Sequence, residues 1–237
     1  MQLIAQIIFV IALIAGVGLF TRNIRRIIRN IKLGRPVDRT DSAGQRFGKM
    51  ARIAFGQSKM VKRPLSGILH IIVYLGFIII NIEVLEILID GIFGTHRVLS
   101  FAGPIYNFLI GAFEILALLV LIGVIIFWTR RNITNVYRFL GRELKGWPKN
   151  DANYILYFEM VLMTLFLIMN ATDYQLQLNG HSYYSGEAGI IGSFPVSQFL
   201  SPLFDGMSDG TLIIIERAAW WLHILGIFFF LNYLYYS

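Results

Sequence analysis

The sequence predicts an all-α membrane protein, a bundle of five transmembrane helices with its N-terminus outside. Three observations lead to this fold class. Apolar residues make up 56% of the 237-residue chain and charged residues only 15%, against about 25% charged in an average soluble domain. Five separate stretches approach or exceed the roughly 20 apolar residues that a helix needs to cross about 30 Å of hydrocarbon. Nineteen of the 21 Lys and Arg residues lie in the first and third connections between these stretches, which fall on the same side of the membrane.

The five spans belong to one membrane domain over residues 1–237, and they are expected at residues 3–20, 68–89, 104–128, 154–169 and 212–235. A signal peptide carries its positive charge before the apolar run. Here the first basic residue, Arg22, comes after the run, so the first span is expected to be a retained helix. The fourth span is short and ends before Asn170. None of the five shows the alternation of a membrane barrel strand.

The basic residues predict the orientation. The connection between the first two spans holds 13 Lys and Arg residues, and the connection between the third and fourth holds six. The second connection holds only Arg97, and the long fourth one holds no Lys or Arg but carries Asp173, Glu187, Asp205 and Asp209. Since positive loops resist translocation, the basic side is expected in the cytoplasm, as in a multi-pass protein of the cytoplasmic (inner) membrane. Contact with membrane lipid is expected, and no nucleic acid, because the basic loops simply alternate with the spans.

Two connections are long enough to fold. Residues 44–61 place Phe47, Met50 and Ile53 near one helical face among basic residues, which predicts a short helix at the cytoplasmic interface. The outer connection, residues 173–210, is expected to fold back as a cap over the outer helix ends. Aromatic residues that fit an interfacial belt are Tyr183, Tyr184, Trp220 and Trp221.

Several function classes are excluded or disfavoured. The chain has no Cys, so it holds no disulfide, zinc–thiolate site or cysteine-ligated iron–sulfur cluster within these residues. It lacks the P-loop, GxSxG, HExxH and dinucleotide-binding motifs, so neither a hydrolase nor an ATPase is indicated. A transporter is disfavoured because no inverted repeat or broken helix is seen.

Two histidines inside the spans are candidate ligands of haem iron. An ionisable residue at mid-membrane costs about 2.5–3.5 kcal/mol, and a buried neutral imidazole is a good axial haem ligand. His70 is expected roughly 5–10 Å inside the cytoplasmic boundary and His223 roughly 18 Å inside, so the two need not bind the same iron. Gly67, Gly76 and Gly226 are expected to leave room for a macrocycle. The alternative is a structural, hydrogen-bonded role for each imidazole.

Carboxylates in the outer half form a second candidate site. Glu83 and Glu86 share one helical face, and Glu114 lies at a similar depth. They fit a quinone or proton site near the outer surface, or equally hydrogen bonding to polar partners such as Asn81, Asn107 or Arg217. Expected to be solvated or interfacial are Glu159, Glu216, Arg217, His96 and His181.

The stretch from Gly56 to His70, which includes Arg63, Pro64 and Gly67, resembles the start of the second helix in haem-b membrane domains of the nitrate reductase gamma-subunit type. It is more similar still to the N-terminal membrane domain of heterodisulfide reductase-related iron–sulfur oxidoreductases. The segments 220–223 and 232–237 also resemble that family, and the resemblance covers nearly the whole chain.

The resemblance implies one or two b haems ligated from the second and fifth helices, with His70 as the cytoplasmic-side ligand and His223 as the deeper one. Two departures stand out. Where two-haem members carry another histidine on the second helix, this chain has Ile80 and Asn81. The family's fifth helix also continues past a serine like Ser237 to the usual partner of His70, so the resemblance implies the N-terminal part of a longer chain that carries the clusters.

The leading hypothesis is the membrane part of an oxidoreductase, which transfers electrons between quinone and a cytoplasmic iron–sulfur domain or subunit through b-type haem. The alternative is a haem-free membrane anchor or assembly module for a redox complex.

Overall fold

The computed structural model describes residues 2–38, 40–60, 63–134, 136, 141, 145–185 and 189–237. In this part of the chain, five helices are long and apolar enough to cross a membrane, which confirms the predicted fold class. They are α1 (Gln2–Lys32), α3 (Pro64–Phe93), α4 (Pro104–Asn132), α5 (Trp147–Leu178) and α7 (Asp209–Tyr233). Glu187 of the acidic connection and Val61 of the predicted interfacial segment lie outside the described residues.

The helix ends follow local sequence signals. Helices α3, α4 and α5 each have a proline in the first two positions, where its missing N–H costs no hydrogen bond. The Ser208 side chain caps α7 by accepting a hydrogen bond from the N–H of Thr211 at 3.3 Å. Helix α3 stops at Gly94, whose φ of 70° is left-handed and favours glycine.

Helix α5 contains the predicted fourth span, 154–169, and extends beyond it at both ends, from Trp147 to Leu178. The prediction stopped before the polar residue Asn170. In the structure Asn170 and Asp173 are 0% and 2% exposed, since they face the interior of the bundle. A polar side chain that is paired inside the bundle does not end a membrane helix.

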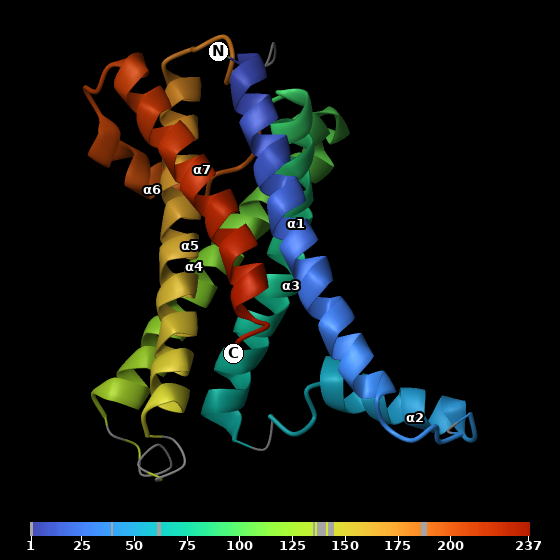
Figure 1. Ribbon diagram of the computed structural model, residues 1–237. Coiled ribbons are helices and arrows are strands. Elements are labelled where there is room, and N and C mark those ends of the chain that lie inside the picture. Colours follow the sequence, from blue (N-terminus) through green and yellow to red (C-terminus); the bar gives the residue numbers. More distant parts are fainter. Residues whose placement is uncertain are drawn as a thin grey trace.

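The bundle has two distinct ends (Figure 1). The N-terminus and the segment between α5 and α7 lie at one end, called the N-terminal end below. The opposite, basic end carries the short helix α2 (Ala43–Met50). Helices α5 and α7 pack along each other, as do α3 and α4, whereas α1 contacts α3 and α7 from the edge. Only 11% of the apolar window of α1 is buried, against 44% in α4 and α5, so α1 is peripheral.

Helix α2 and the π-helix η1 (Ala51–Phe55) form the short helix predicted within residues 44–61. None of their residues is buried, and the segment lies to one side of the bundle (Figure 1). Phe47 and Phe55 are both exposed. An apolar face of this kind, with basic residues beside it, fits a helix at the membrane surface.

The segment between α5 and α7 folds back onto the bundle, as expected. It contains α6 (Ser197–Leu200) and the 3-10 helix η5 (Ser201–Phe204), both of which contact α5. The Glu114 carboxylate of α4 accepts hydrogen bonds from the backbone N–H groups of Val196, at 2.9 Å, and Ser197, at 3.1 Å. Backbone groups at this depth need such partners because hydrocarbon supplies none. Glu114 therefore holds the returning segment in place.

Candidate functional site

His223 lies in the interior of the bundle. Its side chain is 1% exposed, and its Nδ1 lies 2.9 Å from the carbonyl oxygen of Leu162 on α5. A carbonyl can only accept a hydrogen bond, so Nδ1 carries the proton and Nε2 keeps a free lone pair. Metal-binding histidines are typically oriented in this way, by a hydrogen bond from the nitrogen that does not bind the metal. The donor chemistry of His223 therefore fits a haem-iron ligand.

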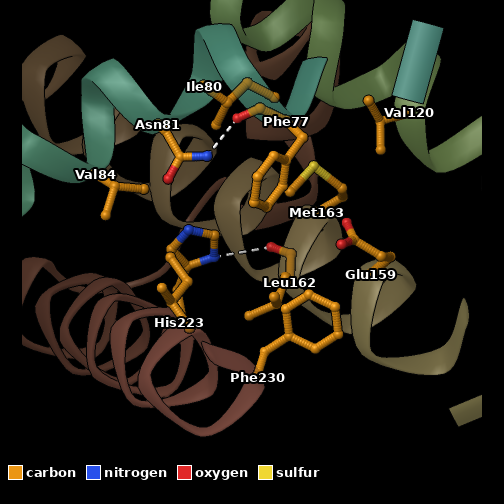
Figure 2. Close-up of a pocket in the computed structure, with 11 residues that line it drawn as sticks. Phe77, Ile80, Asn81, Val84, Val120, Glu159, Leu162, Met163, His223 and Phe230 are labelled. Atoms are coloured by element: carbon orange, nitrogen blue, oxygen red, sulfur yellow. Dashed lines mark hydrogen bonds between the residues drawn. The ribbon is translucent and has the colours of Figure 1, made fainter. Parts of the chain in front are cut away.

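A small cavity of about 60 Å³ adjoins the His223 ring between α3, α4, α5 and α7. Its lining is mostly apolar, with Asn81 and Glu159 as the other polar side chains. Figure 2 shows the second ring nitrogen of His223 pointing toward Asn81, whose amide donates to the carbonyl of Phe77 on its own helix. Glu159 was expected to be solvated; instead it is half-buried and lines this cavity.

The His223 imidazole has a nitrogen free to bind a metal, but the space beside it in this structure is too small for a haem held between two histidines. Pockets for cofactor-sized ligands measure about 300–1,000 Å³, several times the volume of this cavity. A Cβ atom on Gly76 would lie 2.4 Å from Val120 Cγ2, and one on Gly226 would lie 2.7 Å from a Leu162 methyl carbon. These two glycines therefore allow close helix packing and do not leave space for a macrocycle, contrary to expectation.

His70 lies apart from His223. It is half-buried near the start of α3, with Nε2 at 3.3 Å from the Gln57 side-chain oxygen. The α3 residues that line the His223 cavity begin at Phe77, which is about 10 Å further along the helix axis. The structure therefore does not bring His70 and His223 to one iron, in agreement with the depth difference expected from the sequence.

The predicted carboxylate site divides into separate roles. Glu86 accepts hydrogen bonds from the Tyr106 hydroxyl and the Leu99 N–H, both at 2.9 Å. Glu83 is 4% exposed, and one of its oxygens has no hydrogen-bond partner among the described residues. Glu83 and Glu86 share a cavity of about 30 Å³ with several charged residues, a space large enough for one or two waters. Glu114 serves the returning segment instead.

Arg97 organises the polar network at the N-terminal end, a role that was not predicted from the sequence. Its guanidinium is buried, with Nε and Nη2 each 2.7 Å from an Asp173 oxygen, and it also donates to Tyr106 and Asn170. Burial, the largest single influence, lowers the pKa of Arg97, but Asp173, Tyr106 and Glu83 together outweigh it and hold the pKa well above its ordinary value. The sequence feature that could have indicated this role is that Arg97 is the only Lys or Arg in its connection.

His96 and Glu216 were expected to be solvated or interfacial, and both are largely buried. The His96 side chain is 11% exposed, with Nε2 at 3.6 Å from an Asp173 oxygen, which is too long for a hydrogen bond. Glu216 is 1% exposed, accepts a hydrogen bond from Tyr184 at 2.9 Å and pairs with Arg217. Burial raises the pKa of the Tyr184 hydroxyl, so this donor stays protonated.

A larger cavity of about 490 Å³ lies beside these residues, between α1, α3, α7 and the returning segment. Tyr183, Tyr184, Trp220 and Trp221, the residues predicted to form an interfacial belt, line it together with His96. The N-terminal end therefore combines a buried ion-pair network with an aromatic cavity of ligand size.

Two curated proteins are similar to the chain at low identity. It is 29% identical over 227 residues, 96% of its length, to the "Probable iron-sulfur-binding oxidoreductase FadF" of Bacillus subtilis. It is 24% identical over 198 residues, 82% of its length, to the "EtfAB:quinone oxidoreductase" of Syntrophomonas wolfei. The chain spans only 30% and 26% of these two proteins. No family model and no solved structure matches it.

Both relatives are named as oxidoreductases, and one name specifies iron–sulfur binding. The chain is therefore similar to proteins named as oxidoreductases, one of them for iron–sulfur binding, which supports that part of the predicted resemblance. Neither name refers to haem or to heterodisulfide reductase.

Proposed function

We propose that this chain is the membrane part of a redox enzyme, in which electrons pass between membrane quinone and an iron–sulfur module at the basic end through b-type haem. The observation that carries the haem part of the proposal is the buried His223 imidazole, whose Nδ1 donates to Leu162 while Nε2 stays free. Such a group is costly to place in a membrane without a function.

The redox part of the proposal rests on the relatives. One is named for iron–sulfur binding and the other for quinone, and the five spanning helices suit a substrate that is dissolved in the membrane. With no Cys in 237 residues, any cysteine-ligated cluster belongs to residues or subunits outside this segment.

In this proposal His70 and His223 would each provide an imidazole nitrogen to a haem iron, and the helices around His223 would have to separate to admit the macrocycle. His70 is the ligand nearer the basic end and His223 the deeper one. A bound b-type haem would supply a one-electron carrier inside the hydrocarbon layer. The chain itself contributes the Leu162 carbonyl, which fixes the His223 tautomer, and apolar helix faces that exclude water from the imidazole.

The test is the optical spectrum of the full-length polypeptide purified in detergent. We expect b-type bands in the reduced-minus-oxidised spectrum, weakened in His70→Leu and in His223→Gln. Glutamine at 223 still donates to Leu162 but does not ligate haem iron as an imidazole does, so it preserves the packing. His181→Leu, in the returning segment, is the matched control and should leave the bands unchanged.

Two results would overturn this proposal in different ways. Absence of b-type bands from the unmutated protein removes the haem. Full bands in both variants, with both proteins monodisperse, leave the haem but remove His70 and His223 as its ligands.

A second candidate function is a haem-free membrane anchor or assembly module. It is favoured by Asn81 opposite His223 and by the small volume of the cavity between them. In that case His70→Leu and His223→Gln would leave the activity and assembly of the whole enzyme unchanged.

A further inference from the structure

Two adjoining cavities lie between α1 and α7 at the N-terminal end. The first is the aromatic cavity of about 490 Å³. The second is an open groove of about 520 Å³ on the lipid-facing side, lined by Ile4, Ala5, Ile8, Ala12, Trp221 and Leu225. Ala5 and Trp221 line both spaces, so the groove and the aromatic cavity adjoin at these two residues.

The groove suits a hydrocarbon chain. All six of its lining residues are apolar, and Ile4 and Ile8 are more than half exposed on the face of α1 that meets lipid. The small side chains of Ala5 and Ala12 leave the space open. An aliphatic tail in the groove would contact apolar side chains on one side and lipid on the other, with no polar group to desolvate.

The aromatic cavity suits a flat ring. Phe9 lies 5.4 Å from Trp220 and 6.0 Å from Trp221, measured between ring centroids, and the two tryptophan rings are 5.3 Å apart. Elsewhere in the lining, the ring centroids of His96 and Tyr184 lie 4.8 Å apart. Such walls offer the edge and face contacts that aromatic rings prefer, and the volume is that of a small-molecule pocket.

One nitrogen of His96, a residue that lines this cavity, lacks a hydrogen-bond partner among the described residues. His96 Nε2 is buried and makes no hydrogen bond within the described part of the chain, and its nearest acidic oxygen, on Asp173, is 3.6 Å away. Buried nitrogens of this kind normally have a hydrogen-bond partner. His96 also lines the neighbouring small cavity together with Asp173, so a carbonyl or hydroxyl oxygen of a ring in the aromatic cavity would reach Nε2 once the His96 side chain turns toward it.

The local charges disfavour a phospholipid headgroup as the occupant. Asp90 lines the aromatic cavity and forms no ion pair among the described residues, whereas the positive charge of Arg217 is already paired with Glu216. Anionic groups would be repelled by the Asp90 carboxylate, whereas a neutral ring that bears oxygens would not.

We propose that these two cavities form one quinone-binding site. The ring occupies the aromatic cavity with an oxygen at His96 Nε2, and the isoprenoid tail lies in the groove between α1 and α7. The proposal rests on the proposed function for the class of ligand. It moves the quinone site from Glu83, Glu86 and Glu114, where the sequence suggested it, to cavities lined in part by residues that were predicted to form the interfacial belt.

The first experiment locates the ligand. The full-length polypeptide in lipid nanodiscs is labelled with a photoreactive azido-quinone that carries a short isoprenoid tail, and the labelled peptides are mapped by mass spectrometry. We expect labels within residues 4–12 and 220–225, removed by excess unlabelled quinone. Labels confined to the His223 cavity, or competition as strong by a phospholipid as by the quinone, would overturn the proposal.

The second experiment tests the tail and the ring contact separately. Ala12→Phe fills the groove and should weaken quinone binding, measured by quenching of tryptophan fluorescence, about tenfold or more. Ala15→Phe is the matched control, because Ala15 is exposed on α1 and is not part of the groove. His96→Phe should weaken binding by a similar factor, and His96→Gln, which keeps a donor, should recover part of it. Equal binding in Ala12→Phe and Ala15→Phe would exclude the groove.

Failure of this proposal and failure of the proposed function give different results. Labelling at α1 and α7 in a protein without b-type bands supports this site and removes the haem. Normal b-type bands with labelling elsewhere remove this site and leave the proposed function intact.

Discussion

Replacing Arg97 with leucine is expected to unfold the bundle at a much lower temperature. Arg97 is 6% exposed, and its Nε and Nη2 both lie 2.7 Å from Asp173, which is 2% exposed. Removing one partner of a buried ion pair leaves the other charge buried and costs about 3–5 kcal/mol. Among the described residues, Gln177 would still donate a hydrogen bond to the Asp173 side chain, at 2.9 Å.

The expected shift in melting temperature follows from the size of the protein. A change of 1 kcal/mol moves the midpoint by about 2–4 °C in a domain of about 150–250 residues. The loss of 3–5 kcal/mol therefore corresponds to a fall of about 6–20 °C. Thermal unfolding in detergent, followed by tryptophan fluorescence, measures this directly.

A matched arginine and a double variant make this prediction specific. Arg46 pairs with Asp41 at 3.7 Å on the surface, where both side chains are exposed, so Arg46→Leu should change the midpoint little. Arg97→Leu combined with Asp173→Leu should recover most of the loss, because an apolar pair often replaces a buried ion pair without cost. If Arg97→Leu unfolds at the same temperature as Arg46→Leu, the pair does not hold this end of the bundle together.

Three further predictions concern other parts of the structure. Glu114→Leu leaves two backbone N–H groups of the returning segment unpaired, which costs about 1–3 kcal/mol each. The melting temperature should therefore fall, and proteolysis between α5 and α7 should accelerate. An unchanged cleavage rate would contradict this role. Gly76→Ala forces a methyl group against Val120 and should lower the stability by about 1–3 kcal/mol. The Gly76→Ala/Val120→Ala double variant should recover part of this stability. Additive losses in the double variant would exclude the contact. Burial raises the folded-state pKa of Tyr184, so the stabilisation that this shift provides is complete below the unfolded pKa of about 10 and is lost as pH rises above it. The midpoint should fall above about pH 10 and fall less in Tyr184→Phe, and identical pH profiles would refute this link.

The five spans could be predicted because hydrocarbon allows few alternatives to an apolar helix of sufficient length. The length of α5 could not. The prediction ended at Asn170, and whether such a residue ends a helix depends on whether Arg97, 73 positions away in sequence, comes to meet it. Pairings of this kind are tertiary contacts, which hydropathy along the chain does not contain.

The candidate site was predictable residue by residue but not as an arrangement. His223, Glu83 and Glu86 stood out because ionisable side chains are rare in membrane spans. His96 did not, since a histidine in a short connection is expected to be solvated. Its burial depends on the returning segment, which packs over it in the folded protein. The aromatic cavity combines parts of α1, α3, α7 and two connections, and no local pattern indicates that these segments meet.

The position of the proposed quinone site bears on the haem question. Along α3, Asp90 lines the aromatic cavity and His70 lies near the basic end, 20 residues and therefore about 30 Å away. Electrons that enter at one level and leave at the other need a carrier between them, and His223 faces α3 at Asn81, between the two levels. Quinone labelling at α1 and α7 in a protein without b-type bands would leave that distance without a carrier. It would therefore favour the anchor function over electron transfer through the bundle.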